Sequence, residues 1–269
     1  MAQAVPAREA VTARPDPRDL ARRIERAQAV QLDRTGPGTA LPVAGGWAVM
    51  KGPRSPFSAA LGLGLEGPVS AEELARVEAH LGVAGGPVRV ELLSCADPLL
   101  AELLGQRGYA LERFLQVWWR RPLPPPEAPG AEVRPVADGE QRAWVEVFAQ
   151  SFLGGPTQSD TQRRALGAMT RAEGNTCFLA FEGGAPAGCA VVSAVGGVAI
   201  LSGAGVLPAR RGRGLQLALV RARLDWAAGR GCDVAAGTTE PGSASTRTLE
   251  KAGFRCAYPK VVMVRSGWR

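Results

Sequence analysis

A proline-rich run divides the chain into two parts of similar length. Five of the nine residues from Pro122 to Gly130 are proline, which has no amide hydrogen to donate to a helix or a sheet. We expect this run to be an extended linker. A chain of 269 residues is long enough for two domains of ordinary size. The sequence therefore predicts one domain over residues 1–121, a linker over 122–130 and a second domain over 131–269.

The second part alternates between patterns typical of strands and of helices. Apolar residues recur at helical spacing between Gln141 and Phe152, and short apolar runs bounded by glycine or proline follow it. The predicted strands are 133–136, 176–182, 187–195, 198–206, 233–238 and 254–265, and the predicted helices are 141–152, 160–173, 212–230 and 243–252. This order predicts a mixed α/β (α+β) fold, in which a central sheet is flanked by helices.

The longest uncharged stretch, Gly183–Ala209, has the hydropathy of a candidate membrane span. Glycine is frequent in it, and the pair Gly196-Gly197 lies near its middle. Two apolar runs joined by a Gly-Gly turn are typical of a buried β-hairpin. We therefore expect a hairpin here and no membrane partner.

The first part has a related pattern. Its predicted helices are 16–33, one that begins at the capping box of Ser70 and Glu73, and 98–107, and its predicted strands are 47–51, 57–65, 88–92 and 111–120. A shift of 145 residues aligns Gly108-Tyr109 with Gly253-Phe254, and 117–120 with 262–265. Strand, helix, Gly-aromatic pair and final strand agree in one register, which indicates an internal repeat.

The composition excludes several classes of enzyme. The single histidine, His80, leaves no residue for a Ser-His-Asp triad or a histidine-rich metal site, so we expect no metal. The five cysteines are odd in number and never spaced C-x-x-C, which favours reduced thiols in a cytoplasmic protein. The first sixteen residues lack the apolar core of a signal peptide. These features predict a cytoplasmic location.

The net charge of +7 is concentrated in one segment. Residues 204–230 contain six arginines and a single acidic residue, Asp225. A nucleic-acid surface would need a broader basic face. The segment therefore indicates a local anion site, and we expect no nucleic-acid partner.

The anion site is expected where the strand 198–206 runs into the helix that follows it. The first amides of a helix have no internal partners and lie at the positive end of the helix dipole. Gly212 and Gly214 would let a phosphate approach these amides, and Arg211 and Arg213 can bind phosphate oxygens in a bidentate way. Pyrophosphate is the expected ligand group.

These residues resemble the GNAT superfamily of N-acetyltransferases. The family's Q/R-x-x-G-x-G/A signature falls on Ala209, Gly212 and Gly214, and Ala209 departs from it. The segment 245–254 is similar to the family's fourth helix, although Thr248 stands where asparagine is usual. The resemblance covers residues 131–265, and the first part looks like a degenerate repeat with no arginine at residues 66–70. It implies two GNAT-like mixed-sheet domains in tandem, of which only the second binds CoA.

The resemblance also implies a mechanism. Acetyl-CoA would lie between the strands 198–206 and 233–238, with backbone groups of Val206 and Leu207 on its pantetheine and thioester. The amides of Arg211, Gly212, Arg213, Gly214, Leu215 and Gln216 would hold its pyrophosphate. A small-molecule or peptide amine would attack the thioester directly, so that no covalent nucleophile is needed.

The acid and base are the least determined part of the site. Glu240 is the first candidate for the base, and a solvated loop glutamate is the alternative. Tyr258 or Ser245 is the candidate that protonates the departing thiolate; the alternatives are packing for Tyr258 and a helix N-cap for Ser245. Because these residues are weak candidates, a non-catalytic CoA or acyl-CoA binding protein, a sensor or scaffold, is the competing hypothesis. The oligomeric state is left open.

Overall fold

The computed structural model describes residues 15–52, 55–123, 131–152, 154–156 and 159–266. The helices of these residues are α1 (Pro17–Arg34), α2 (Ala71–Leu81), α3 (Leu99–Gln106), α4 (Gln141–Phe152), α5 (Asp160–Arg171), α6 (Leu215–Ala228) and α7 (Ala244–Lys251). The strands are β1 (Thr39–Val43), β2 (Gly46–Met50), β3 (Ala59–Leu61), β4 (Val88–Leu93), β5 (Ala110–Arg120), β6 (Glu132–Pro135), β7 (Asn175–Glu182), β8 (Ala185–Val195), β9 (Val198–Val206), β10 (Val234–Thr239) and β11 (Arg255–Arg265). Most of the linker predicted over 122–130 lies outside the described residues.

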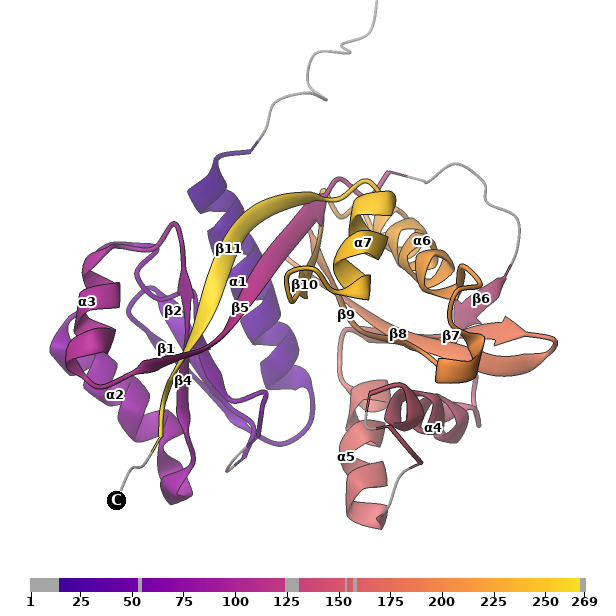
Figure 1. Cartoon of the computed structure of the whole chain (residues 1–269), viewed down its shortest axis with the longest axis horizontal. Coiled ribbons are helices and arrows are strands. Elements are labelled where there is room, and N and C mark those ends of the chain that lie inside the picture. The colour runs from indigo at the N-terminus through magenta and orange to yellow at the C-terminus, as the bar shows by residue number, and fades with distance from the viewer. Residues whose placement is uncertain (1–14, 53–54, 124–130, 153, 157–158, 267–269) are drawn as a thin grey trace, which may run out of the picture.

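All of these strands belong to one mixed sheet, in the order β1-β2-β3-β4-β11-β5-β10-β9-β8-β7-β6. The last strand of each part pairs with the other part: β5 is antiparallel to β10, and β11 is antiparallel to β4. The two exchanged strands are paired with each other at the centre of the molecule (Figure 1). The parts predicted from the sequence therefore share one sheet and exchange their final strands.

The repeat is visible in the elements themselves. β5 and β11, and likewise α3 and α7, begin and end at positions that differ by 145 residues.

The predicted hairpin over 183–209 is β8 and β9, and Gly196 and Gly197 form its turn with φ angles of 54° and 78°. The capping box at Ser70 is also present. No helix among the described residues is long and apolar enough to cross a membrane.

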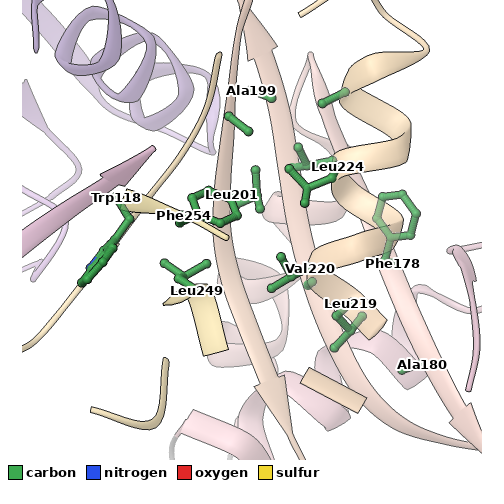
Figure 2. Packing of buried hydrophobic residues seen from close by; sticks show 14 of the residues in the cluster. Trp118, Phe178, Ala180, Ala199, Leu201, Leu219, Val220, Leu224, Leu249 and Phe254 are labelled. Atoms are coloured by element: carbon green, nitrogen blue, oxygen red, sulfur yellow. The ribbon is translucent and has the colours of Figure 1, made fainter. Parts of the chain in front are cut away.

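Helices cover both faces of the second part of the sheet. On β8, Ala190 and Val192 pack in the core cluster of α6 and α7, whereas Cys189 and Val191 pack in the cluster of α4. Figure 2 shows α6 side chains, among them Leu219 and Leu224, packed against these strands. On β5, Trp118 faces the same cluster as α6, and its two neighbours face α1. Therefore α1 and α4 lie on one face of the sheet, and α6 and α7 lie on the other.

Candidate functional site

The parallel strands β9 and β10 separate at their carboxyl ends. They are paired only from Val198 to Ile200 and from Val234 to Ala236, although β9 continues to Val206 and β10 to Thr239. Ligands of α/β sheets commonly bind beyond the carboxyl ends of strands where neighbouring strands diverge. The gap between β9 and β10 lies where the sequence places the ligand.

A β-bulge distorts β9 beside the gap. The register against β8 changes between Cys189–Gly205 and Val191–Ser202, so that β9 carries one extra residue there. Gly203 has a φ of 52°, and a Cβ on it would lie 3.2 Å from Val191 and 3.3 Å from Phe148. The bulge therefore requires glycine at this position.

The loop after β9 presents a run of open amides. A 3₁₀ turn, η3 (Pro208–Arg210), leads to Gly212 and Gly214, which have φ angles of 79° and 80°. A Cβ at either glycine would meet no atom within 4 Å. The first amide of α6 with a backbone acceptor is that of Ala218, whereas the amides of 212–217 donate to no backbone carbonyl of the described residues. This geometry suits an anion with several oxygens, such as a pyrophosphate.

The arginines of this loop are held by protein groups, unlike the free cations that the sequence suggests. Arg213 and Arg210 donate to the two carboxylate oxygens of Glu182 at 2.9 and 2.8 Å. Arg211 lies along the strand and donates to the carbonyl oxygens of Val206 at 3.3 Å and Ser151 at 3.5 Å. An anion would therefore meet the open amides first and would compete with Glu182 for Arg213.

Glu182 should consequently weaken anion binding at the loop. The hydrogen bond from Arg213, and then that from Arg210, holds the pKa of the Glu182 carboxyl below its usual range, so it stays charged at neutral pH. We expect Glu182→Gln to bind acetyl-CoA about two- to fivefold more tightly at low ionic strength, because two guanidinium groups are released. Calorimetry in 50 mM and 500 mM salt would measure the effect, which should shrink as salt screens these exposed charges. Weaker binding by the variant would show that Glu182 instead orders the loop for its ligand.

Val206, Leu207, Leu215 and Gln216 have different roles in the loop. Leu207 donates its amide to the Ala187 carbonyl at 2.9 Å, so this amide faces β8 and is not available to a ligand in the gap. Leu215 is buried and anchors the start of α6 in the core. The Gln216 side chain donates to the Ala204 carbonyl at 3.4 Å. The Val206 carbonyl already accepts from Arg211, so the Val206 amide remains a candidate, whereas the Leu207 amide does not.

Glu240 and Ser245 lie beyond the end of β10 and are both exposed. The backbone carbonyl of Glu240 accepts a hydrogen bond from Thr246, whose hydroxyl is also 2.8 Å from that of Thr239. The N-cap of α7 is Ser243, which accepts from the amide of Thr246, so Ser245 is not the cap. Both candidates are thus exposed residues that follow the carboxyl end of β10, and their catalytic roles stay predictions.

Tyr258 lies elsewhere. It is buried on β11, and β5 separates that strand from β10 and the gap. Its hydroxyl donates to Glu25 of α1 at 2.9 Å. Of the two alternatives that the sequence leaves open for Tyr258, the structure favours packing over protonation of the thiolate, because strand exchange puts β11 in the interior of the sheet and away from the gap.

A contact from the first part reaches β9, and the sequence gives no signal for it. The side chain of Gln31, on α1, is buried and donates to the hydroxyl of Ser202 at 3.0 Å. Ser202 stands between the last β9 residue paired with β10 and the bulge. The face of the gap opposite α6 is therefore formed in part by α1.

The equivalent loop of the first part is closed. Residues 62–70 stand where 207–215 stand in the second part, and Leu63 and Leu65 in this loop are buried in the core. The Gly64 carbonyl accepts the amide of Asp97 at 2.8 Å, which ties the loop to the end of β4. That the first part binds no CoA stays a prediction, and this filled loop is a structural reason for it.

A protein-family comparison matches residues 141–254 to the acetyltransferase (GNAT) family. A search of curated proteins finds no match. Among solved structures, a GCN5-related N-acetyltransferase from Kribbella flavida has a TM-score of 0.69 at 20% identity, covering 93% of this chain and 96% of that one. One from Sphaerobacter thermophilus has a TM-score of 0.59 at 21% identity, covering 93% of both.

A third structure shares the two-part architecture. It is a tandem GNAT protein from the clavulanic acid biosynthesis pathway, with a TM-score of 0.61 at 16% identity over 90% of this chain and 88% of that one. At these identities the likeness concerns the fold. The tandem mixed-sheet fold predicted from the sequence is confirmed.

Proposed function

We propose, from the premise that residues 141–254 form a domain of the acetyltransferase (GNAT) family, that this chain is an acetyl-CoA-dependent N-acetyltransferase. The observation that carries the proposal is the run of open amides at the start of α6, beside the gap between β9 and β10. Amides there bind the pyrophosphate, and backbone groups of β9 near Val206 align the thioester. Members of this family are generally acyltransferases, and the open amides beside the gap support a reaction of that class here.

The acceptor amine enters from the face opposite α6. Gln31 and Ser202 line that face, and α4 closes it further along, since a Cβ on Gly205 would lie 2.6 Å from the Cβ of Ser151. The close approach of α4 to β9 at Gly205 and of α1 to β9 at Ser202 favours a small-molecule or peptide amine over a folded protein surface. Glu240 is the proposed base, directly or through water, because it is an exposed carboxylate at the β10 side of the gap.

The test has two stages. Calorimetry first measures the Kd for acetyl-CoA, and release of free thiol is then followed with a panel of small amines and peptides. Turnover with one acceptor class supports the proposal, whereas absence of acetyl-CoA binding contradicts it.

A non-catalytic CoA-binding role is the second candidate, and one observation favours it. Tyr109 and Tyr258, the tyrosines of this chain, are both buried, and neither lies at the gap. Neither tyrosine is therefore placed to protonate the departing thiolate. Tight binding with no turnover across the whole amine panel would favour this sensor or scaffold role.

Gln31 gives a prediction specific to the acceptor side. Gln31→Ala leaves the Ser202 hydroxyl without its buried donor, and we expect the KM for the amine to rise about three- to tenfold. The Kd for acetyl-CoA should stay within a factor of two, because the partner of Gln31 is Ser202 on β9, whereas the proposed pyrophosphate site is formed by amides of the loop that begins α6. Ser202→Ala should give a similar change, and the double variant should add little to either single one. An equal loss of acetyl-CoA affinity would assign Gln31 to general packing instead.

A further inference from the structure

Arg223 carries a buried positive charge that the proposed function has not yet used. It projects from α6 with 2% of its surface exposed, at a position whose neighbours in the core are apolar. Its Nε donates to the Leu219 carbonyl at 2.9 Å, and its Nη1 donates to the carbonyls of Val191 and Ser202 at 3.2 and 3.3 Å. Among the residues that the structure describes, no carboxylate is paired with this guanidinium.

A buried charge without a counter-ion is costly, and desolvation lowers the pKa of this guanidinium to about 9. The titratable group beside it is Cys189, and burial raises the pKa of that thiol to about 12, so it is neutral at physiological pH. The charge of Arg223 is therefore met by three backbone carbonyls and, among the described residues, by no carboxylate, and at a buried position such a charge acts more strongly on its surroundings than it would in water. A negative charge arising nearby would be stabilised.

The position of Arg223 directs that effect to the gap. Ser202 follows the last β9 residues paired with β10 and precedes the bulge at Gly203. The carbonyl and the amide of one trans peptide point in opposite directions, so the amide of Gly203 is directed away from the guanidinium bound to the Ser202 carbonyl. A cation hydrogen-bonded to the Ser202 carbonyl polarises the whole peptide group, so the Gly203 amide becomes a stronger hydrogen-bond donor.

We propose that Arg223 is a positioning residue whose buried charge stabilises the thiolate that leaves when the acetyl group is transferred. This inference rests on the proposed function. In the step, the amine nitrogen forms a bond to the acyl carbon, the carbon–sulfur bond breaks, and its electron pair stays on sulfur. The proton of the amine passes to the base, and the thiolate is protonated later by solvent. A buried cation takes the place of a tyrosine acid, since Tyr258 is held by Glu25 away from the gap.

The experiment uses the whole chain and CoA itself, and needs no acceptor. Titration of the ultraviolet absorbance of the thiolate in the CoA complex, with the desulfo-CoA complex as blank, gives the fraction of bound CoA that is thiolate. A free thiol titrates near 8.5. At pH 7.5 we expect a thiolate fraction about tenfold above the free value in the wild type, and a return to within about threefold of that value in Arg223→Met.

Two further variants separate charge from packing. Arg223→Lys keeps the charge and should retain most of the enrichment, and Arg221→Met removes a charge from the same helix and should leave the wild-type value. A wild-type thiolate fraction equal to that of free CoA overturns the inference without any variant. The inference is also overturned if the thiolate fraction of bound CoA in Arg223→Met equals that in the wild type. It is likewise overturned if Arg223→Lys lowers this fraction as much as Arg223→Met does. Absence of CoA binding to the wild type is seen in the calorimetric Kd and rejects the proposed function together with this inference.

Discussion

Replacing Gly212 and Gly214 together with aspartate is expected to weaken acetyl-CoA binding at least about 100-fold. Two carboxylates would stand in the path of the pyrophosphate and oppose the positive end of α6. Because a Cβ at either position meets no protein atom within 4 Å, the substitutions cause no clash inside the protein. The loss of affinity would therefore report on the ligand site and not on packing.

Backbone strain is the remaining alternative cause, and the chain offers a matched control for it. Gly231 follows the other end of α6, has a φ of 67°, and is also surrounded by open space. Gly231→Asp adds the same side chain at a similar left-handed conformation, with a similar strain of about 1–2 kcal/mol. We expect it to bind acetyl-CoA as the wild type does. Calorimetry on both variants and on Gly212→Ala with Gly214→Ala measures strain and charge separately.

Equal binding by the wild type and the double aspartate variant would remove the α6 loop from the site. In that case the gap between β9 and β10 would need another explanation. A loss of affinity in Gly231→Asp as large as in the double variant would instead show that α6 as a whole had been disturbed.

The loop could be predicted from the sequence because its signal is local. A strand, two glycines and a helix start lie within residues 198–216, and both glycines have the positive φ that only glycine adopts without strain. The partners of its arginines could not be predicted. Glu182 lies 31 residues before Arg213 along the chain, and the pairing depends on where β7 ends. Only the three-dimensional structure shows that Arg213 is already paired with the carboxylate of Glu182.

The helices and strands could also be predicted from local sequence patterns, whereas the pairing of strands that are distant along the chain could not. The helix over 141–152 and the strand over 198–206 match the periodic patterns that predict them. The sequence does not predict the edge strand β1, which contains Pro42. Proline is tolerated in this strand because only β2 pairs with it. The exchange of β5 and β11 leaves no trace in either strand's own pattern, so the sequence could not decide between the two alternatives for Tyr258, packing and catalysis.

That exchange is held in place by a buried cluster of charged residues. Lys260 of β11 is 1% exposed and lies 2.9 Å from Glu25 of α1 and 2.5 Å from Glu91 of β4. Tyr258 donates to Glu25 in the same cluster. Both carboxylates come from the first part of the chain, whereas Lys260 and Tyr258 come from the second. The cluster thus joins the two parts at the centre of the sheet.

We expect Lys260→Met to lower the free energy of unfolding by about 3–5 kcal/mol, the largest stability effect predicted here. The change leaves two buried carboxylates without a counter-ion. Desolvation already raises the pKa of Glu25, and Lys260 opposes that rise, so removing the lysine raises it further. Raised carboxyl pKa values contribute stability that is present below the ordinary value of 4.5 and lost as pH increases. The penalty of Lys260→Met, measured by urea denaturation, should therefore be smaller at pH 4 than at pH 7.

The matched control tests the charge itself. Lys260→Met combined with Glu25→Gln and Glu91→Gln removes all three charges, and at pH 7 it should regain a large share of the stability that the single variant loses. Because the cluster spans both parts, the wild type should unfold in one transition that is followed equally by fluorescence and by circular dichroism. Two separated transitions in the wild type would mean that the parts fold independently and that the exchanged strands contribute little to their union. A single transition that becomes two in Lys260→Met would locate the coupling of the halves at this cluster.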